Sequence, residues 1–235
     1  MSKIRALASS SKGNAYLITD GQTPILLECG IPWKELQKKL DFKTREIKCC
    51  LISHEHQDHC KAIADVMKAG IDVYSSAGTF DALQLSDHHR GHVIKAREQF
   101  TVGTWTILPF ETQHDAAEPL GFLLVNQAGD KLLFATDTYY IRYKFHGLTH
   151  IMIECNYAAD ILRSNVDAGL VPEAMKKRLM QSHFSLENVK EFLRANDLSK
   201  VKEIHLLHLS DGNSDADRFK RELQRLTGKP VYIAG

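Results

Sequence analysis

The sequence lacks the features of a secreted or membrane-spanning protein. Its five cysteines are odd in number and form no CxxC pair. Most of them lie in apolar runs, where reduced thiols are expected. No apolar run is long enough to cross a bilayer, and no apolar signal core follows the first residues. We therefore expect a cytoplasmic protein that does not bind membranes.

A strong net charge is also missing. The 30 Lys and Arg residues nearly balance 29 Asp and Glu residues, which leaves a net charge of +1. No global field then attracts nucleic acid, so any such binding must come from local basic groups. Histidine, in contrast, is frequent: the 12 histidines form clusters, which indicates metal or proton chemistry.

The length and the order of the expected elements predict the fold class. A chain of 235 residues, 43% of them hydrophobic, suits one domain with a full core, and we predict a single domain over residues 1–235. Early strands with hairpin signals are followed by alternating helices and strands. Two packed sheets with helices on their outer faces satisfy this order, which is an α/β (α+β) class.

The densest chemical signal lies at residues 54–59. His54, His56, Asp58 and His59 directly follow a predicted buried strand at 49–53. His54 and His56 alternate and can face one cation, whereas Asp58 and His59 lie past the expected turn and can reach another. Imidazole and carboxylate together suit zinc, manganese or iron. A solvated polar turn is the competing interpretation, but it accounts poorly for so many ligands at this spacing.

Further ligand types follow at the ends of predicted strands. His114 lies just past one strand, Asp137 ends another, and His208 lies within a third apolar run, 204–209. A bare carboxylate at the end of an apolar strand is costly unless it is paired or metal-bound. Each residue alone could equally be a cap or a packed polar group. Together, and in this order, they predict a two-metal site.

This pattern resembles the metallo-β-lactamase fold superfamily. The resemblance implies a four-layer αββα sandwich with a dinuclear site at the edge of its two sheets. By this resemblance, one ion is held by His54, His56 and His114, the other by Asp58, His59 and His208, and Asp137 bridges them. Two divalent ions, zinc or manganese, are expected, and iron, nickel and magnesium are also compatible.

Five further blocks look like those of the YycJ/WalJ-like branch of that superfamily. The branch is regarded as acting on nucleic acid, with 5′-to-3′ DNA exonuclease activity, and a related enzyme can stand beside a single-strand annealing protein in phage recombination modules. The resemblance thus implies DNA 5′ ends as substrate, a metal-bridging hydroxide as nucleophile, a role in recombination or repair, and an annealing protein as partner. The blocks are residues 8–14, 135–139, 153–157, 183–188 and 208–210.

The sequence departs from this branch in three places. Glu28-Cys29 stands where Asp-Ala is usual, Tyr157 where His is usual, and Ser182 where Gly is usual. These differences concern substrate details rather than the metal ligands.

Two residues are expected to act in catalysis. Asp58 should orient the nucleophile as well as bind metal. His183 precedes a predicted helix at 186–195, and we expect it to contact the scissile phosphate or to protonate the leaving oxygen. The alternative is a structural hydrogen bond at the start of that helix. Candidate substrate contacts, which could equally be a tight strand connection or a helix cap, are Ser10, Ser11, Lys12, Asn14 and Ser185.

Supporting groups are less certain from sequence. Ligand histidines need partners for their second ring nitrogen, and Glu28, Glu55 and Glu154 are candidates, with caps or surface charges as alternatives. An aromatic group at Tyr139, Tyr140 and Tyr143 is expected either to stack on a terminal base or to belong to the core. Arg142 with Lys144 is one of several local basic groups.

Competing functions remain at this point. An RNA-processing endonuclease of the same fold usually carries a long protruding arm, and no segment here is long enough to form one. A small-molecule hydrolase of thioesters, lactones or cyclic phosphodiesters would use the same metals. A non-catalytic metal-stabilised module would not need a second metal with open positions.

Overall fold

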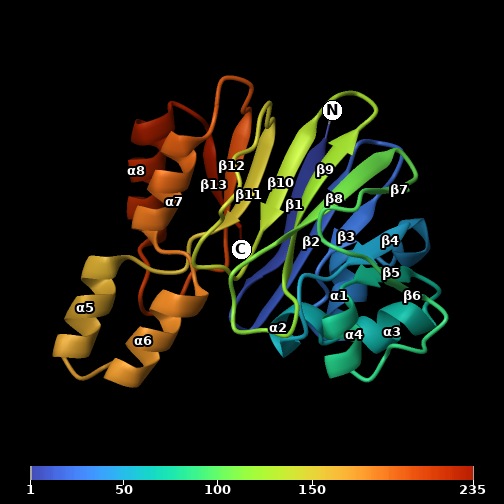
Figure 1. The fold of residues 1–235 in the computed structure, drawn as a ribbon, viewed down its shortest axis with the longest axis horizontal. Helices are drawn as coiled ribbons and strands as arrows, with labels where there is room; N and C mark the ends of the chain where they lie inside the picture. Colours follow the sequence, from blue (N-terminus) through green and yellow to red (C-terminus); the bar gives the residue numbers. More distant parts are fainter. Residues whose placement is uncertain (1, 235) are drawn as a thin grey trace. The chain divides into compact units, whose positions relative to one another are not determined.

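The computed structural model describes residues 2–234. These residues divide into two compact units: residues 2–111 with Ala116–Asp130, and Thr112–Asp115 with Lys131–Ala234. Both units combine strands and helices, as the predicted α/β class requires (Figure 1). The prediction of one domain over the whole chain stays a prediction.

The first unit contains a six-stranded sheet in the order β1-β2-β3-β4-β5-β6. The first three strands pair antiparallel, and each later strand pairs parallel to the one before it. Neighbouring parallel strands need a crossover connection, and the short helices of this unit lie in the connections from β3 to β4, from β4 to β5 and from β5 to β6. The strands are β1 (Lys3–Ser10), β2 (Gly13–Thr19), β3 (Ile25–Leu27), β4 (Cys49–Leu51), β5 (Asp72–Ser75) and β6 (Gly91–Val93).

The same unit adds three antiparallel strands and its helices. Strand β8 (Trp105–Glu111) pairs with β7 (Phe100–Val102) and with β9 (Leu120–Asn126). Trp105 is fully buried, and its indole N–H donates to the carbonyl of Thr23 at 3.0 Å. The helices are α1 (Trp33–Lys39), the 3-10 helix η1 (Thr44–Glu46), α2 (Gln57–Cys60), α3 (Ile63–Lys68) and α4 (Ala77–Ala82).

The second unit is built on four parallel strands in the order β13-β12-β11-β10. Their near-continuous apolar runs are typical of strands that are covered on both faces. Because the strands are parallel, the residues that follow them meet at one edge of the sheet. The strands are β10 (Lys131–Ala135), β11 (His150–Glu154), β12 (Glu203–Leu207) and β13 (Val231–Ile233).

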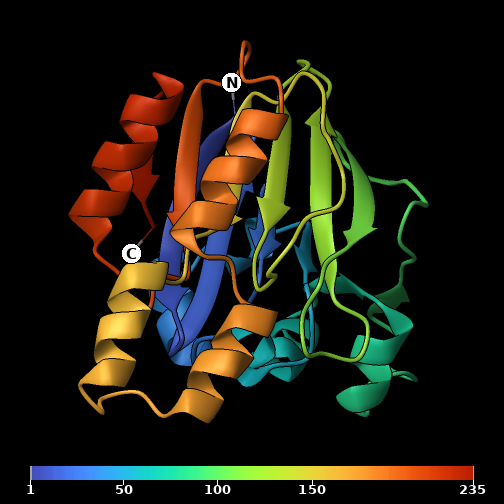
Figure 2. The same ribbon diagram turned by 60° about the vertical axis from the view of Figure 1, so that its left-hand side comes forward.

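Local sequence signals explain where the helices of the second unit begin and end. Ser185 caps one helix by accepting from the backbone N–H of Asn188 at 3.1 Å. Asp215 caps another by accepting from the backbone N–H of Arg218 at 2.9 Å. The latter helix ends at Gly228, which adopts a left-handed φ of 66°. Figure 2 shows the four helices, which are α5 (Ala159–Asp167), α6 (Glu173–Ser182), α7 (Leu186–Ala195) and α8 (Ala216–Thr227).

Two expectations from the sequence were wrong, and one strand was not expected. The cluster at 54–59 is not only a turn, because helix α2 begins at Gln57. Residues 91–93 form strand β6, where no strand was predicted; pairing with β5 overrides their hydrophilic composition. Strand β12 ends at Leu207, so His208 follows the strand instead of lying inside it.

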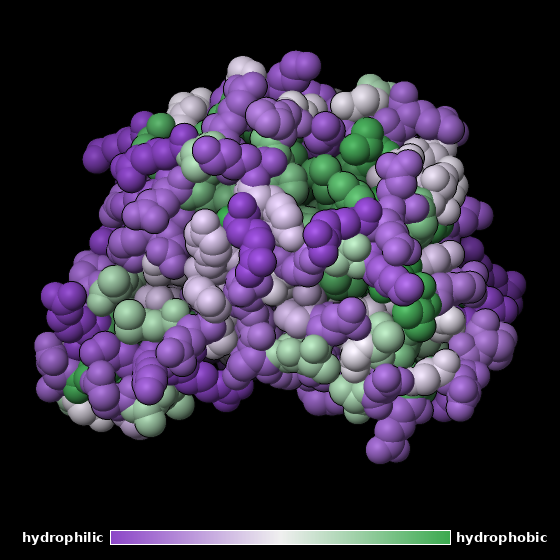
Figure 3. Space-filling model, viewed as in Figure 1, coloured by the Kyte–Doolittle hydropathy of each residue, from purple (hydrophilic) through white to green (hydrophobic). Residues whose placement is uncertain are grey.

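The thiols and the apolar surface complete the picture. All five cysteines are free and buried. Within the described part of the chain, no helix has the length and hydropathy needed to traverse a bilayer. Large exposed apolar side chains concentrate around α5 and α6, where Leu170, Met175 and Met180 are each at least half exposed. Figure 3 shows apolar atoms in green among the hydrophilic surface of that segment.

Candidate metal centre and catalytic residues

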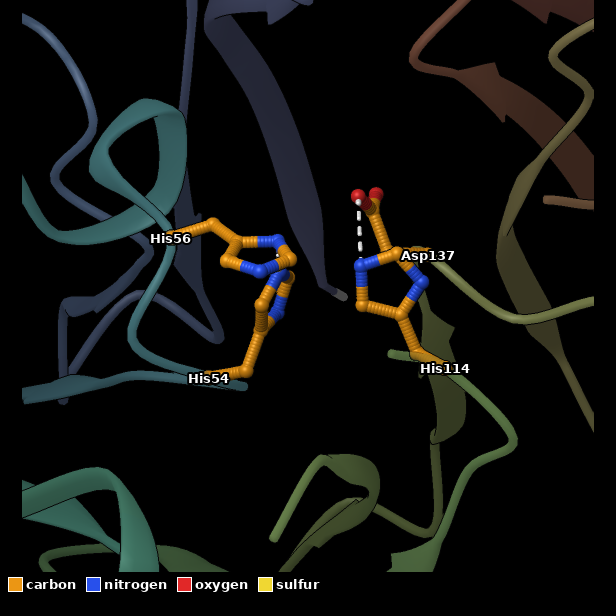
Figure 4. Close-up of side chains that lie close together, drawn as sticks. All are labelled: His54, His56, His114 and Asp137. Atoms are coloured by element: carbon orange, nitrogen blue, oxygen red, sulfur yellow. Dashed lines mark hydrogen bonds and ion pairs between the residues drawn. The ribbon is translucent and has the colours of Figure 1, made fainter. Parts of the chain in front are cut away.

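His54 and His56 lie just after strand β4 in the first unit. The His54 ring is oriented by Ser53, whose hydroxyl hydrogen-bonds its Nδ1 at 2.8 Å. The opposite nitrogen, Nε2, lies 3.1 Å from Nδ1 of His56. The two rings, drawn in Figure 4, meet edge to face, and their centroids are 4.6 Å apart. This places two imidazole nitrogens side by side, as the alternating spacing predicted.

Asp58 and His59 lie on helix α2. Nε2 of His59 is 3.3 Å from Oδ2 of Asp58. Asn14 holds this pair, because its Nδ2 donates to the carbonyl of Asp58 at 3.2 Å and contacts the Asp58 carboxylate at 3.4 Å. Asn14 is fully buried. The structure therefore places Asn14 against the metal-ligand candidates, a supporting role that the sequence did not indicate.

Glu28 supports the same histidine from behind. It is fully buried, its Oε1 lies 3.8 Å from Nδ1 of His59, and it accepts from the backbone N–H of Ser53 at 3.1 Å. Burial raises the pKa of the Glu28 carboxyl, while the nearby His59 ring and the hydrogen bond from Ser53 oppose that rise. Glu28 thus lies beside the second ring nitrogen of His59, and its role as the partner of a ligand histidine stays a prediction. Glu55 instead accepts from the backbone N–H of Ala117.

Gly30 packs directly against helix α2, which creates a testable steric constraint. A Cβ at Gly30 would lie 1.7 Å from the carbonyl oxygen of Asp58 and 2.7 Å from the nitrogen of His59. We expect Gly30→Ala to displace α2 and to lower the free energy of unfolding by about 1–3 kcal/mol or more. Urea unfolding measures this loss, and metal analysis shows whether the displaced ligands bind less metal.

The control for Gly30→Ala is Gly212→Ala, because an added Cβ there meets nothing within 4 Å. Gly212→Ala should retain both the stability and the metal content of the parent protein. A Gly30→Ala variant as stable as that control would contradict the close approach.

Asp137 is the carboxylate that the candidate ligand histidines of the second unit contact. It follows β10 with an unusual positive φ of 41°, and His208, just past β12, has a φ of 52°. Such conformations are costly for residues other than glycine and are concentrated at functional sites. Nδ1 of His208 hydrogen-bonds Oδ1 of Asp137 at 2.7 Å, and Thr136 donates to the same oxygen.

His114 contacts the other oxygen of this carboxylate. Its Nε2 lies 3.7 Å from Oδ2 of Asp137, the pair joined by a dashed line in Figure 4. Its Nδ1 lies 2.8 Å from the carbonyl of Ser182, which can only accept, so Nδ1 carries the proton and Nε2 bears the lone pair. Burial lowers the pKa of His114 by more than Asp137 raises it. A neutral imidazole held in this way is the form that binds metal.

Glu154, at the end of β11, is a buried carboxylate with a full set of partners. Its Oε1 lies 2.5 Å from Nδ1 of His183 and 3.4 Å from Nδ1 of His208. Its Oε2 accepts from the backbone N–H groups of Thr138 at 3.0 Å and Phe184 at 3.1 Å. This connection was only one of two interpretations from the sequence. The detectable signal was a carboxylate that ends an apolar strand.

Charges in the second unit fit a divalent cation. Burial alone would lower the pKa of His208, but Asp137 and Glu154 together raise it to about 10. A proton on His208 therefore balances two buried carboxylates, and a cation could take its place. In both units the histidines and carboxylates belong to groups that are compatible with binding divalent metal ions.

The structure separates the predicted substrate contacts into two kinds. Ser11 and Lys12 are exposed at the turn after β1, where Ser10 accepts from the backbone N–H of Lys12 at 3.1 Å. Asn14 and Ser185 are buried and already make structural hydrogen bonds. Their roles toward substrate stay predictions.

A family model described as "Beta-lactamase superfamily domain" matches residues 23–208. The chain belongs to this superfamily. Its membership, with the metal-compatible histidines and carboxylates, makes it a metal-dependent hydrolase. The fold class and the superfamily that the sequence predicted are thereby confirmed.

Two relatives in sequence place the chain near one branch of this superfamily. The chain is 27% identical over 228 residues to "Exodeoxyribonuclease WalJ" of Streptococcus pneumoniae serotype 2 (strain D39), with 90% of this chain and 83% of that protein covered. It is 26% identical over 242 residues to "Exodeoxyribonuclease YycJ" of Bacillus anthracis, with 96% and 87% covered. These matches confirm the predicted resemblance to the YycJ/WalJ-like branch.

Solved structures support the fold. The metallo-β-lactamase fold protein YhfI from Bacillus subtilis matches with a TM-score of 0.77 and 17% identity, over 99% of this chain and 95% of that one. The short form of human tRNase Z matches with a TM-score of 0.65 and 14% identity, over 100% and 96%. At these identities the likeness concerns architecture alone.

Proposed function

We propose that this protein is a dinuclear metal-dependent phosphodiesterase that hydrolyses DNA from 5′ ends. The observation that carries the proposal is the position of His183. The buried carboxylate of Glu154 holds the His183 ring so that the ring's Nδ1 lies 4.0 Å from Oδ2 of Asp137. A positioned imidazole beside a metal ligand suits a reaction that must release an oxyanion leaving group. The two relatives named exodeoxyribonucleases support DNA as the substrate.

The proposed ligand set follows the superfamily pattern. Two divalent ions, zinc or manganese, would supply a hydroxide at neutral pH and stabilise charge on the phosphoryl oxygens when bound. Asp58 also orients the attacking water, and Asn14 fixes that carboxylate. The first ion is assigned to His54, His56 and His114, the second to Asp58, His59 and His208, and both to Asp137.

His183 acts on the phosphate or on the leaving oxygen. Its Nδ1 points at the Glu154 carboxylate, which accepts a hydrogen bond from that nitrogen and fixes the ring. Burial would lower the pKa of His183, but Glu154 and Asp137 raise that pKa above its usual value, which favours a ring protonated on both nitrogens. In that protonated ring, Nε2 is the atom that can donate to a phosphate oxygen or to the leaving oxygen. The His183 side chain is 16% exposed, so it is mostly buried but still accessible to a substrate.

The proposed setting is the cytoplasm, where the five free thiols would stay reduced. A role in DNA recombination or repair, with a single-strand annealing protein as partner, extends the proposal and is supported by the resemblance to the YycJ/WalJ-like branch.

A substrate panel tests the proposed activity. Purified protein with added Mn²⁺ or Zn²⁺ is incubated with 5′-phosphorylated duplex DNA, single-stranded DNA, structured RNA and a chromogenic phosphodiester. Stepwise release of nucleotides from DNA 5′ ends is the expected result. Cleavage of structured RNA alone would favour an RNA-processing endonuclease. Hydrolysis of the chromogenic ester with DNA untouched would favour a small-molecule hydrolase, and either of these outcomes would overturn the DNA proposal.

A further inference from the structure

The second unit has an aromatic pocket of about 350 Å³, within the size range of small-molecule sites. One wall is the segment after β10, residues 139–144, and the other is helix α7 with the residue before its cap. Side chains that define it are Tyr139, Tyr140, Arg142, Phe184, Asn188 and Phe192. No residue in this set is among the proposed metal ligands.

Exposure excludes the core interpretation for two of the three tyrosines. Tyr140 is 56% exposed and Tyr139 is 38% exposed, so neither belongs to the core. Phe184 and Phe192, in contrast, are buried below them with ring centroids 6.5 Å apart. The pocket therefore has buried aromatic residues on one side and accessible tyrosine rings on the other, which suits a flat aromatic guest.

Hydrogen bonds hold the tyrosine segment in place. The side-chain amide of Asn188 donates to the carbonyl of Tyr139 at 3.0 Å, and the Thr138 hydroxyl donates to the carbonyl of Tyr140 at 2.8 Å. At the far end, Asn196 accepts from the backbone N–H of Phe145 at 2.7 Å. A preformed pocket loses less entropy when a ligand binds.

The pocket and the proposed catalytic histidine share one anchor. Oε2 of Glu154 accepts from the N–H of Thr138, which precedes Tyr139, and from the N–H of Phe184, which follows His183. Both walls of the pocket thus begin at the carboxylate that orients His183. Tyr139 and Phe184 are thus held beside the carboxylate that orients His183, the side chain proposed to contact phosphate.

Charge at the pocket indicates the kind of ligand. Arg142 and Lys144 are exposed and line it, with Glu191 as the one acidic side chain of the lining. Positive charge beside accessible aromatic rings is the combination that binds single-stranded nucleic acid, because bases stack while phosphates pair with cations.

We propose that this pocket binds the nucleobase of a nucleotide next to the scissile phosphate. The base stacks on Tyr139 or Tyr140, and Arg142 with Lys144 contacts the phosphate backbone. Stacking accepts every base, so the pocket would hold the strand without selecting a sequence. The scissile phosphate and the identity of the strand as DNA rest on the proposed function, whereas the recognition of a base does not.

Binding measurements on the metal-loaded protein test the pocket. A dye-labelled single strand with hydrolysis-resistant linkages is compared with the same strand carrying abasic nucleotides at its 5′ end. The parent protein should bind the strand with bases about tenfold more tightly. The double variant Tyr139→Ala/Tyr140→Ala should lose that preference. Tyr232→Ala removes a tyrosine that is 46% exposed in β13, outside the pocket, and should keep it.

A second variant tests the pocket without removing its aromatic rings. Arg142→Ala should weaken binding of both strands and should reduce the slope of log K against log salt by roughly 0.7 for one lost phosphate contact. An unchanged slope would overturn the assigned role of Arg142.

The outcomes for the pocket and for the proposed function can be distinguished. Equal binding of the two strands by the parent protein, or a preference retained by the double variant, overturns the pocket even if DNA is hydrolysed. A preference that the double variant loses supports the pocket even if the substrate panel shows no DNA hydrolysis. Absence of binding to either strand overturns the pocket outright.

Discussion

Removing the metal ions is expected to abolish hydrolysis, and Asp137→Asn is expected to reduce it about 10³-fold or more. A metal contributes several kcal/mol of transition-state stabilisation, which corresponds to this factor. Asp137 is almost fully buried, and His208 and His114 contact its two oxygens. Asn preserves the shape but removes the charge that the cations need. Elemental analysis should show less metal per chain, and Mn²⁺ or Zn²⁺ should restore chelated parent protein but not the variant.

The control for Asp137→Asn is Asp160→Asn. Asp160 is exposed and pairs with Arg218 at 2.7 Å, away from the ligand candidates. This variant should retain full metal content and activity. If Asp137→Asn retained both as well, the proposed bridging role of Asp137 would be wrong.

His183→Ala should lower turnover by roughly 10²–10⁴-fold, the contribution typical of a positioned acid or base. Metal content should stay at the parent level, because His183 is not among the proposed ligands. Glu154→Gln should also lower turnover, since it weakens the contact that fixes the His183 ring. The measurements are turnover at saturating DNA and metal per chain for each variant.

His146→Ala serves as the control for His183→Ala, because His146 is an exposed histidine of the same unit. Parent-level turnover in His183→Ala would refute a catalytic role. Loss of bound metal in that variant would show that His183 is a ligand instead, since Asp137, Glu154, His183 and His208 also lie close enough together to hold an ion.

Much of the candidate site could be predicted because it lies at the ends of buried strands. His54 after β4, Asp137 after β10 and His208 after β12 are polar residues that directly follow apolar runs, and such runs are legible in a sequence. Helix α2 was missed because its four residues are too few to show helical periodicity. Strand β6 was missed because its pairing with β5 depends on a neighbour rather than on its own composition.

The supporting groups were harder to predict because they act through long-range contacts. Asn14 contacts Asp58 from 44 residues away, so no local pattern marks it as a partner of that carboxylate. The close approach of Gly30 to Asp58 is likewise invisible until the chain is folded.

By itself, the sequence determined the candidate ligands, the order of the strands that carry them and the superfamily, because hydrophobic periodicity and residue chemistry are local properties. Only the tertiary structure decided what Glu154 and the tyrosines do. Glu154 and His183 are 29 residues apart. They meet because the segment after β11 pairs with the segment after α6, where the backbone N–H of Asn156 donates to the carbonyl of Phe184. Whether Tyr139 and Tyr140 lie in the core or line a pocket depends on what packs against them, and that is a property of the fold.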